Sequence, residues 1–64
     1  MKITLNGEAQ QVAALTLAAA LAELGYAGTF ATAVNGDFVP AALREGRALS
    51  EGDRIEVLAP RQGG

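Results

Sequence analysis

The chain has 64 residues, with five basic and seven acidic side chains and no cysteine or histidine. These counts allow one small domain, exclude disulfide bonds and thiolate metal sites, and remove the commonest general base and nucleophile. A net charge of −2 without a basic run also argues against nucleic acid as a partner, because neutralising successive phosphates requires clustered lysine and arginine.

The first third of the chain predicts a β-hairpin and then a helix. Lys2–Leu5 alternates polar and apolar side chains, as a half-buried strand does, and Asn6-Gly7 is a preferred two-residue hairpin turn. Residues 8–12 would return as the second strand. Thr16 can cap a helix that Gly25 ends, and the helix carries one apolar stripe. The stripe is formed by Leu17, Ala20, Leu21 and Leu24.

The apolar run over residues 12–22 resembles the core of a secretory signal peptide, but its context argues against one. Lys2 is the only basic residue ahead of the run, and polar residues interrupt the approach to it. A bilayer span needs about 20 apolar residues, which this run does not reach. We therefore expect a cytoplasmic protein with no membrane partner.

The second half of the chain predicts another hairpin. The β-prone residues 30–34 lead to Asn35-Gly36, and residues 37–40 follow as the returning strand. We expect this Asn-Gly pair to serve only as a turn. In the connector over residues 41–48, Leu43 is the apolar residue expected to hold the chain against the core.

The last predicted strand, residues 54–59, separates a buried face from an open one. Leu49, just before it, is a second residue expected to be buried. Alternation along the strand turns one set of side chains inward and the other outward. The inward set is Ile55, Val57 and Ala59, and the outward set is Arg54, Glu56 and Leu58.

The predicted elements follow the order β-β-α-β-β-β, which describes an α+β domain over residues 1–59. A mixed sheet of about five strands would pack on the single helix. One helix covers only one face of such a sheet, so the other face is open to solvent or to a partner. The candidates for docking a partner there are Leu58, Arg54 and Glu56.

Acidic side chains are the remaining candidates for catalysis, but their positions argue against it. They fall on predicted turns and exposed strand positions, which favours solvated or partner-facing roles, and no phosphate-binding glycine loop opens the helix. The chain is therefore not expected to be an enzyme on its own. The acidic residues considered are Asp37, Glu45, Glu51, Asp53 and Glu56.

The final five residues predict a slender, flexible tail. Pro60 lacks a backbone N–H and so favours the end of the strand before it. The extended segment 60–64 would reach roughly 17 Å, far enough to enter another protein's active site. Gly63 and Gly64 have no side chains, so a narrow channel can enclose them and a nucleophile can approach the terminal carboxyl carbon.

Six short segments occur in an order and spacing that together are specific. They are Leu5–Glu8, Thr16-Leu17, Leu24-Gly25, Ala33–Pro40, Glu51–Val57 and Gly63-Gly64. With them the chain resembles the ThiS family of sulfur carriers, ubiquitin-like β-grasp proteins, over essentially its whole length. One departure is Ala13-Ala14-Leu15, where the family usually has a loop that contains glycine or aspartate.

The resemblance implies that Gly64 is the modified residue. A ThiF-like adenylyltransferase would activate its carboxylate with ATP, a persulfide protein would supply sulfur, and a ThiG-like thiazole synthase would accept it from the resulting thiocarboxylate. Gly63, Gln62 and Arg61 would thread into the partner. ATP and its metal ion would bind to that partner, so the resemblance implies no cofactor for this chain.

Two alternatives stay open at this point. The small subunit of molybdopterin synthase has the same fold, diglycine and thiocarboxylate chemistry, although the short chain and the segment Val34–Pro40 favour the thiamin carrier. A ubiquitin-like interaction module that is never activated belongs to another class.

Overall fold

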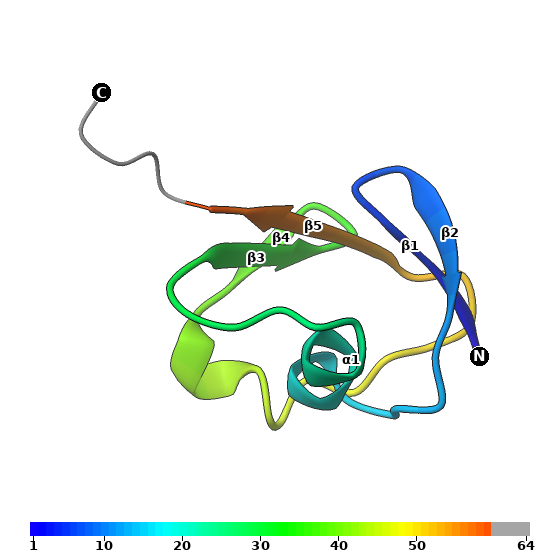
Figure 1. Cartoon of the computed structure of the whole chain (residues 1–64), viewed down its shortest axis with the longest axis horizontal. Helices are drawn as coiled ribbons and strands as arrows, with labels where there is room; N and C mark the ends of the chain where they lie inside the picture. Colours follow the sequence, from blue (N-terminus) through cyan, green and yellow to red (C-terminus); the bar gives the residue numbers. More distant parts are fainter. Residues whose placement is uncertain (60–64) are drawn as a thin grey trace.

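A computed structural model describes residues 1–59 of the chain. The elements follow the predicted order, and a short 3₁₀ helix, η1, is added in the connector (Figure 1). They are β1 (Lys2–Leu5), β2 (Glu8–Gln11), α1 (Leu17–Glu23), β3 (Ala31–Val34), β4 (Asp37–Val39), η1 (Ala41–Leu43) and β5 (Arg54–Leu58).

The five strands form one mixed sheet in the order β2-β1-β5-β3-β4. β5, the last strand in the sequence, lies in the middle, parallel to β1 and antiparallel to β3 (Figure 1). The two hairpins therefore lie on either side of β5 and are joined through it. The segment that follows β5 leaves from the centre of the sheet and not from an edge.

Both hairpins close through two-residue turns whose residues have positive φ. The φ angles are 50° and 86° at Asn6 and Gly7, and 52° and 87° at Asn35 and Gly36. Asparagine and glycine tolerate this region, and such turns match the right-handed twist of paired strands. Both Asn-Gly predictions are confirmed, with the registers Leu5↔Glu8 and Val34↔Asp37 next to the turns.

Helix α1 begins and ends as its sequence predicts. The Thr16 hydroxyl accepts a hydrogen bond from the Ala19 N–H at 3.3 Å, and Gly25 follows the helix with φ of 89°. The connector supplies further partners, because the Leu17 and Ala18 N–H groups donate to carbonyls at residues 47 and 44. The N-terminal end of the helix is therefore tied to the chain that precedes β5.

Glu23 has a role that the sequence did not reveal. Its carboxylate accepts hydrogen bonds from the Ala13 and Ala14 N–H groups at 3.0–3.1 Å. Those amides belong to the loop between β2 and α1, where the chain departs from the family pattern. The only charged residue of the helix thus holds the loop that leads into it.

The core lies between α1 and one face of the sheet (Figure 1). Val12 and Leu49 are buried as predicted, and Leu24 of the predicted stripe is only half-buried at the end of the helix. The buried apolar residues are Ile3, Leu5, Val12, Leu17, Ala20, Leu21, Val34, Val39, Leu49 and Ile55. Because α1 covers one face, the opposite face has no layer of described residues over it.

The prediction that Leu43 holds the connector against the core is wrong, because its side chain is 60% exposed. Arg44 holds the connector instead. Its guanidinium lies 4.4 Å from the centre of the Phe30 ring and donates to the Phe30 carbonyl and to the Thr32 hydroxyl. Thr32 is buried, and its hydroxyl donates a hydrogen bond to the Val39 carbonyl at 2.8 Å, so every member of this group has a partner.

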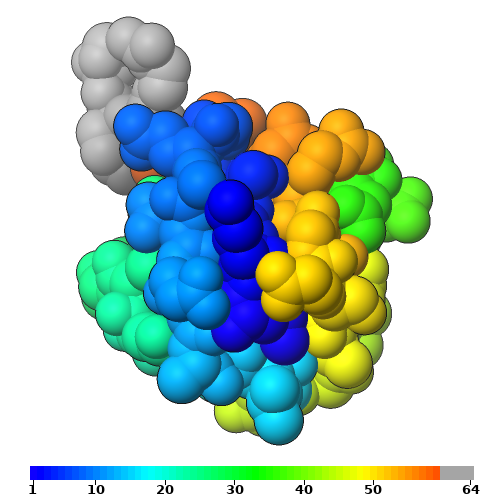
Figure 2. Space-filling view, turned by 90° about the vertical axis from the view of Figure 1, so that its right-hand side faces the viewer, coloured from blue at the N-terminus to red at the C-terminus, as the bar shows by residue number. Residues whose placement is uncertain are grey.

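The N-terminal strand lies beside the chain that enters β5. Figure 2 shows β1 in dark blue between β2 and the yellow residues near position 50. The Gly52 N–H donates to the Lys2 carbonyl at 2.8 Å, and the Lys2 N–H donates to the Glu51 carboxylate at 3.1 Å. These bonds fix β1 along the start of β5.

Across residues 1–59, none of the helices has the length and apolar character that crossing a membrane requires.

Two truncations on β5 separate its buried face from its open face. Ile55 is 1% exposed, so Ile55→Ala should lower the free energy of unfolding by about 2–5 kcal/mol. Leu58→Ala, three residues later on the exposed face, should change it by less than about 0.5 kcal/mol. Chemical denaturation of both variants measures the difference. Similar losses would contradict the assigned register.

Candidate functional site

The outward side chains of β5 are those predicted from the sequence. Arg54, Glu56 and Leu58 are exposed, whereas Ile55 is buried and Val57 half-buried. Ala59 was predicted to share the buried face, but it lies beyond the end of the strand and is exposed. The strand register pairs Leu58 with Ala31 of β3 and Glu56 with Ala33.

An apolar surface surrounds Leu58 on the open face of the sheet. Phe38 of β4 pairs with Ala33, so both side chains share the face that carries Leu58. Leu58 and Phe38 are 74% and 68% exposed, and the small alanines of β3 lie between them. We call Ala31, Ala33, Phe38 and Leu58 the apolar face.

Two adjoining hollows occupy this surface, and Ala31, Phe38 and Leu58 line both of them. One extends toward Phe30 and Arg44, and the other toward Asn6 and Glu56. Exposed apolar side chains around hollows of this kind are typical of protein-binding surfaces. Phe38 was not among the docking residues predicted from the sequence, although the register of a two-residue hairpin places it opposite Ala33.

Arg54 lies at the other end of the open face. It pairs with Thr4 of β1. Along β5, Arg54 precedes Leu58 by four residues, which corresponds to about 13 Å. The predicted docking residues therefore do not form one cluster. Leu58 belongs to the apolar face, Glu56 lies at its border, and Arg54 lies among polar neighbours.

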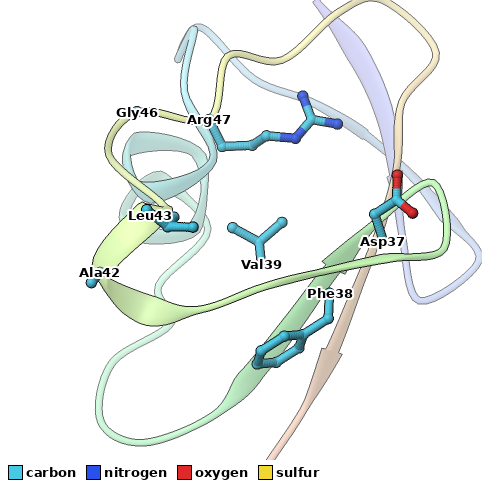
Figure 3. Close-up of a pocket in the computed structure, with 7 residues that line it drawn as sticks. All are labelled: Asp37, Phe38, Val39, Ala42, Leu43, Gly46 and Arg47. Carbon is cyan, nitrogen blue, oxygen red and sulfur yellow. The ribbon is translucent and has the colours of Figure 1, made fainter.

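A separate hollow of about 420 Å³ lies beside β4 and η1 (Figure 3). Figure 3 shows the Val39 side chain pointing toward Leu43 and Arg47, while Phe38 points to the opposite side of the strand. The hollow contains none of the predicted docking residues Leu58, Arg54 and Glu56. It does not adjoin the end of β5.

The asparagines of the two turns do more than close hairpins, which corrects the expectation for Asn35-Gly36. The Asn35 side chain accepts a hydrogen bond from the Arg54 N–H at 2.9 Å and donates to the Asp53 carboxylate at 3.0 Å. The Asn6 side chain accepts from the Val57 N–H at 2.9 Å and donates to the Val57 carbonyl at 3.2 Å. Both bind the strand that leads to the final segment.

The expectation that Asp53 is solvated is wrong, since it is only 9% exposed. The Asn35 amide and the Ser50 N–H hold the pKa of its carboxyl below the ordinary value, against the opposing effect of burial, and Arg47 adds a smaller electrostatic contribution. The other four acidic candidates, Asp37, Glu45, Glu51 and Glu56, are exposed. No group of three acidic side chains gathers into a metal site among the described residues.

The predicted tail residues Arg61, Gln62, Gly63 and Gly64 lie outside the described residues, as does Pro60. The described part of the site is therefore the strand from which they continue and the apolar face beside its last residues.

A five-stranded mixed sheet packed on one helix, with the last strand in its centre, is the architecture of ubiquitin-like β-grasp domains. The sequence matches the ThiS family over residues 3–64, and the chain belongs to that family.

Two solved structures are similar to the whole chain. The crystal structure of the thiamine biosynthesis protein (ThiS) from Geobacter metallireducens is 25% identical, with a TM-score of 0.83 and full coverage of both chains. The NMR solution structure of a thiamine biosynthesis protein from the same organism is also 25% identical, with a TM-score of 0.79 over all of this chain and 88% of that one. No curated protein sequence matches the chain.

The lowered pKa of Asp53 predicts how stability depends on pH. A carboxyl whose pKa is lower in the folded state stabilises the fold above its unfolded pKa, and this contribution is lost as the pH falls through the folded pKa. Asp53→Asn removes the charge that the Asn35 and Ser50 hydrogen bonds stabilise; a loss of about 1 kcal/mol should lower the melting temperature by about 4–8 °C at pH 7. The gap between wild type and variant should shrink as the pH drops below about 4. A gap that widens on acidification would contradict this assignment.

Proposed function

We propose that this protein is a sulfur carrier of thiamin biosynthesis, in which the carboxylate of Gly64 is adenylated and converted to a thiocarboxylate. The observation that carries the proposal is the match to the ThiS family, which extends through Gly63 and Gly64. The β-grasp fold and its similarity to two thiamine biosynthesis proteins support it. So does the central position of β5, the strand from which residues 60–64 continue.

The chemistry requires activation because a carboxylate is a poor electrophile at neutral pH. Attack of the Gly64 carboxylate on ATP forms an acyl-adenylate and releases pyrophosphate. The terminal sulfur of a protein persulfide then attacks the acyl carbon, and AMP leaves. A thiol reduces the acyl disulfide, which leaves the thiocarboxylate on Gly64. When that sulfur is transferred to the thiazole precursor, the acyl carbon takes an oxygen in exchange, from the precursor or from water, and the carboxylate is restored.

In this proposal the carrier is a protein substrate of other enzymes. A ThiF-like adenylyltransferase would bind ATP and its metal ion, a persulfide protein would donate sulfur, and a ThiG-like thiazole synthase would accept it. The absence of cysteine and histidine from the sequence is consistent with this division of labour. Gly63, Gln62 and Arg61 would lie in the partner's channel during each transfer.

The apolar face is the proposed docking surface for these partners. Leu58 lies on it, with only Ala59 between it and the final segment, so docking there would deliver that segment to the partner's active site. A partner that covers Leu58 and Phe38 removes two large exposed apolar side chains from water, which favours association. Glu56 at the border can contribute to specificity by its charge.

Intact-mass spectrometry tests the modification. Incubation with ATP, a ThiF-like adenylyltransferase and a sulfur source should add about 16 Da, because sulfur replaces one oxygen. Deletion of Gly64 should abolish this gain. It should leave the melting temperature almost unchanged, because chain ends ordinarily bury little. If the mass of the wild-type chain does not change, the chain is better explained as an interaction module. If the loaded carrier gives its sulfur to molybdopterin synthase and not to thiazole synthase, the molybdopterin pathway is favoured.

A carboxylate introduced at one of two exposed leucines tests docking. Leu58→Asp places a carboxylate in the apolar face and should raise the Kd for the adenylyltransferase about tenfold or more. Leu43→Asp changes another exposed leucine, on η1 and outside the apolar face, and should leave the Kd within about twofold. Titration calorimetry measures both. Equal losses of affinity would place the docking surface elsewhere.

A further inference from the structure

β5 continues past the end of its neighbour β1. The last paired residues are Leu5 and Ile55, and the Asn6 N–H still donates to the Ile55 carbonyl at 2.9 Å. The chain then turns away at Asn6-Gly7. Val57 is the next residue of β5 whose backbone faces β1, and β1 has no further residue to pair with it.

The side chain of Asn6 takes the place of that missing strand residue. Its Oδ1 accepts a hydrogen bond from the Val57 N–H at 2.9 Å, and its Nδ2 donates to the Val57 carbonyl at 3.2 Å. A carboxamide has one acceptor and one donor group in nearly the geometry of a peptide unit, so it can pair with both backbone groups of one residue. The sheet is thereby extended on this side by one residue of β5.

We propose that Asn6 is a positioning residue for sulfur loading: it fixes the end of β5, and with it the point and direction from which residues 60–64 continue. This inference rests on the proposed function. Val57 is held by Asn6 on one side, and the neighbouring Leu58 pairs with Ala31 on the other. Loss of the Asn6 contacts leaves β3 alone to hold these residues, so the strand end becomes more prone to local opening.

The position of Leu58 connects this contact to docking. Leu58 follows Val57 directly and is part of the apolar face, so a loosened strand end also displaces a proposed docking residue. A partner that binds the loosened carrier must first order the strand end. That ordering weakens binding without changing the reacting groups. We therefore expect an effect on KM and little effect on kcat.

Asn6→Gly isolates the side-chain contacts. Glycine accepts the positive φ of this turn, so the variant removes both hydrogen bonds to Val57 without straining the hairpin. Asn35→Gly is the matched control. Asn35 occupies the same position in the second turn and also makes two side-chain hydrogen bonds, but to residues 53 and 54 at the start of β5.

Two measurements on full-length protein distinguish positioning from general stability. In Asn6→Gly, the Val57 amide should exchange with deuterium at least about tenfold faster than in wild type, while Asn35→Gly leaves it near the wild-type rate. In the loading reaction with adenylyltransferase, ATP and a sulfur source, Asn6→Gly should raise KM for the carrier about three- to tenfold with kcat unchanged. Asn35→Gly should match wild type in both constants.

Asn6→Asp provides a second test if Asn6→Gly folds poorly. Aspartate suits the same turn and retains an acceptor for the Val57 N–H, but its other oxygen faces the Val57 carbonyl. It should raise KM in the same direction.

Equal effects of Asn6→Gly and Asn35→Gly, or wild-type kinetics in both Asn6 variants, would overturn the positioning role. A wild-type chain that gains no sulfur would refute the proposed function instead. In that case the exchange rate of Val57 would still decide whether Asn6 holds the end of β5.

Discussion

The position of β5 between β1 and β3 is the constraint on which the structure depends. A central strand needs hydrogen-bond partners on both sides, and here β1 and β3 provide them. The asparagines of the two hairpin turns complete these ladders, Asn35 at the start of β5 and Asn6 near its end. The same two residues supply the positive φ that closes the hairpins. Turn formation and attachment of the central strand are therefore coupled in this fold, because the asparagine at each turn both adopts the positive φ and binds β5 through its side chain.

The two faces of the sheet differ because the helix covers only one of them. One helix is available, and it covers the face that carries Ile3, Val34 and Ile55. The opposite face keeps two large apolar side chains in water, Phe38 and Leu58, at the end of β5 where the final segment begins. Burial of the first face stabilises the domain, whereas burial of the second requires another protein. The proposed carrier role uses this division, since the side chains that the helix leaves exposed are free to bind a partner.

Much of this architecture could be predicted from the sequence, because local signals were strong. Alternation in Lys2–Leu5, the cap at Thr16 and two Asn-Gly pairs set the elements and their order. The errors came from contacts between distant segments. Leu43 is apolar, yet Arg44 secures the connector through Phe30 and Thr32, and no local pattern indicates a guanidinium in that role.

The candidate site was predictable to a similar extent. Alternation in β5 correctly placed Leu58 on the open face, but Phe38 became part of it only through its pairing with Ala33. Asp53 follows a turn and would ordinarily be solvated, but it is buried and its carboxylate accepts a hydrogen bond from Asn35, which is 18 residues away. The order of strands in the sheet also determines when the fold can form. β5 is the last strand in the sequence, and both hairpins pair with it. The two hairpins can form before β5 is available, but the sheet stays in two halves until β5 pairs with both of them, so closure of the sheet depends on contacts between residues that are far apart in the sequence.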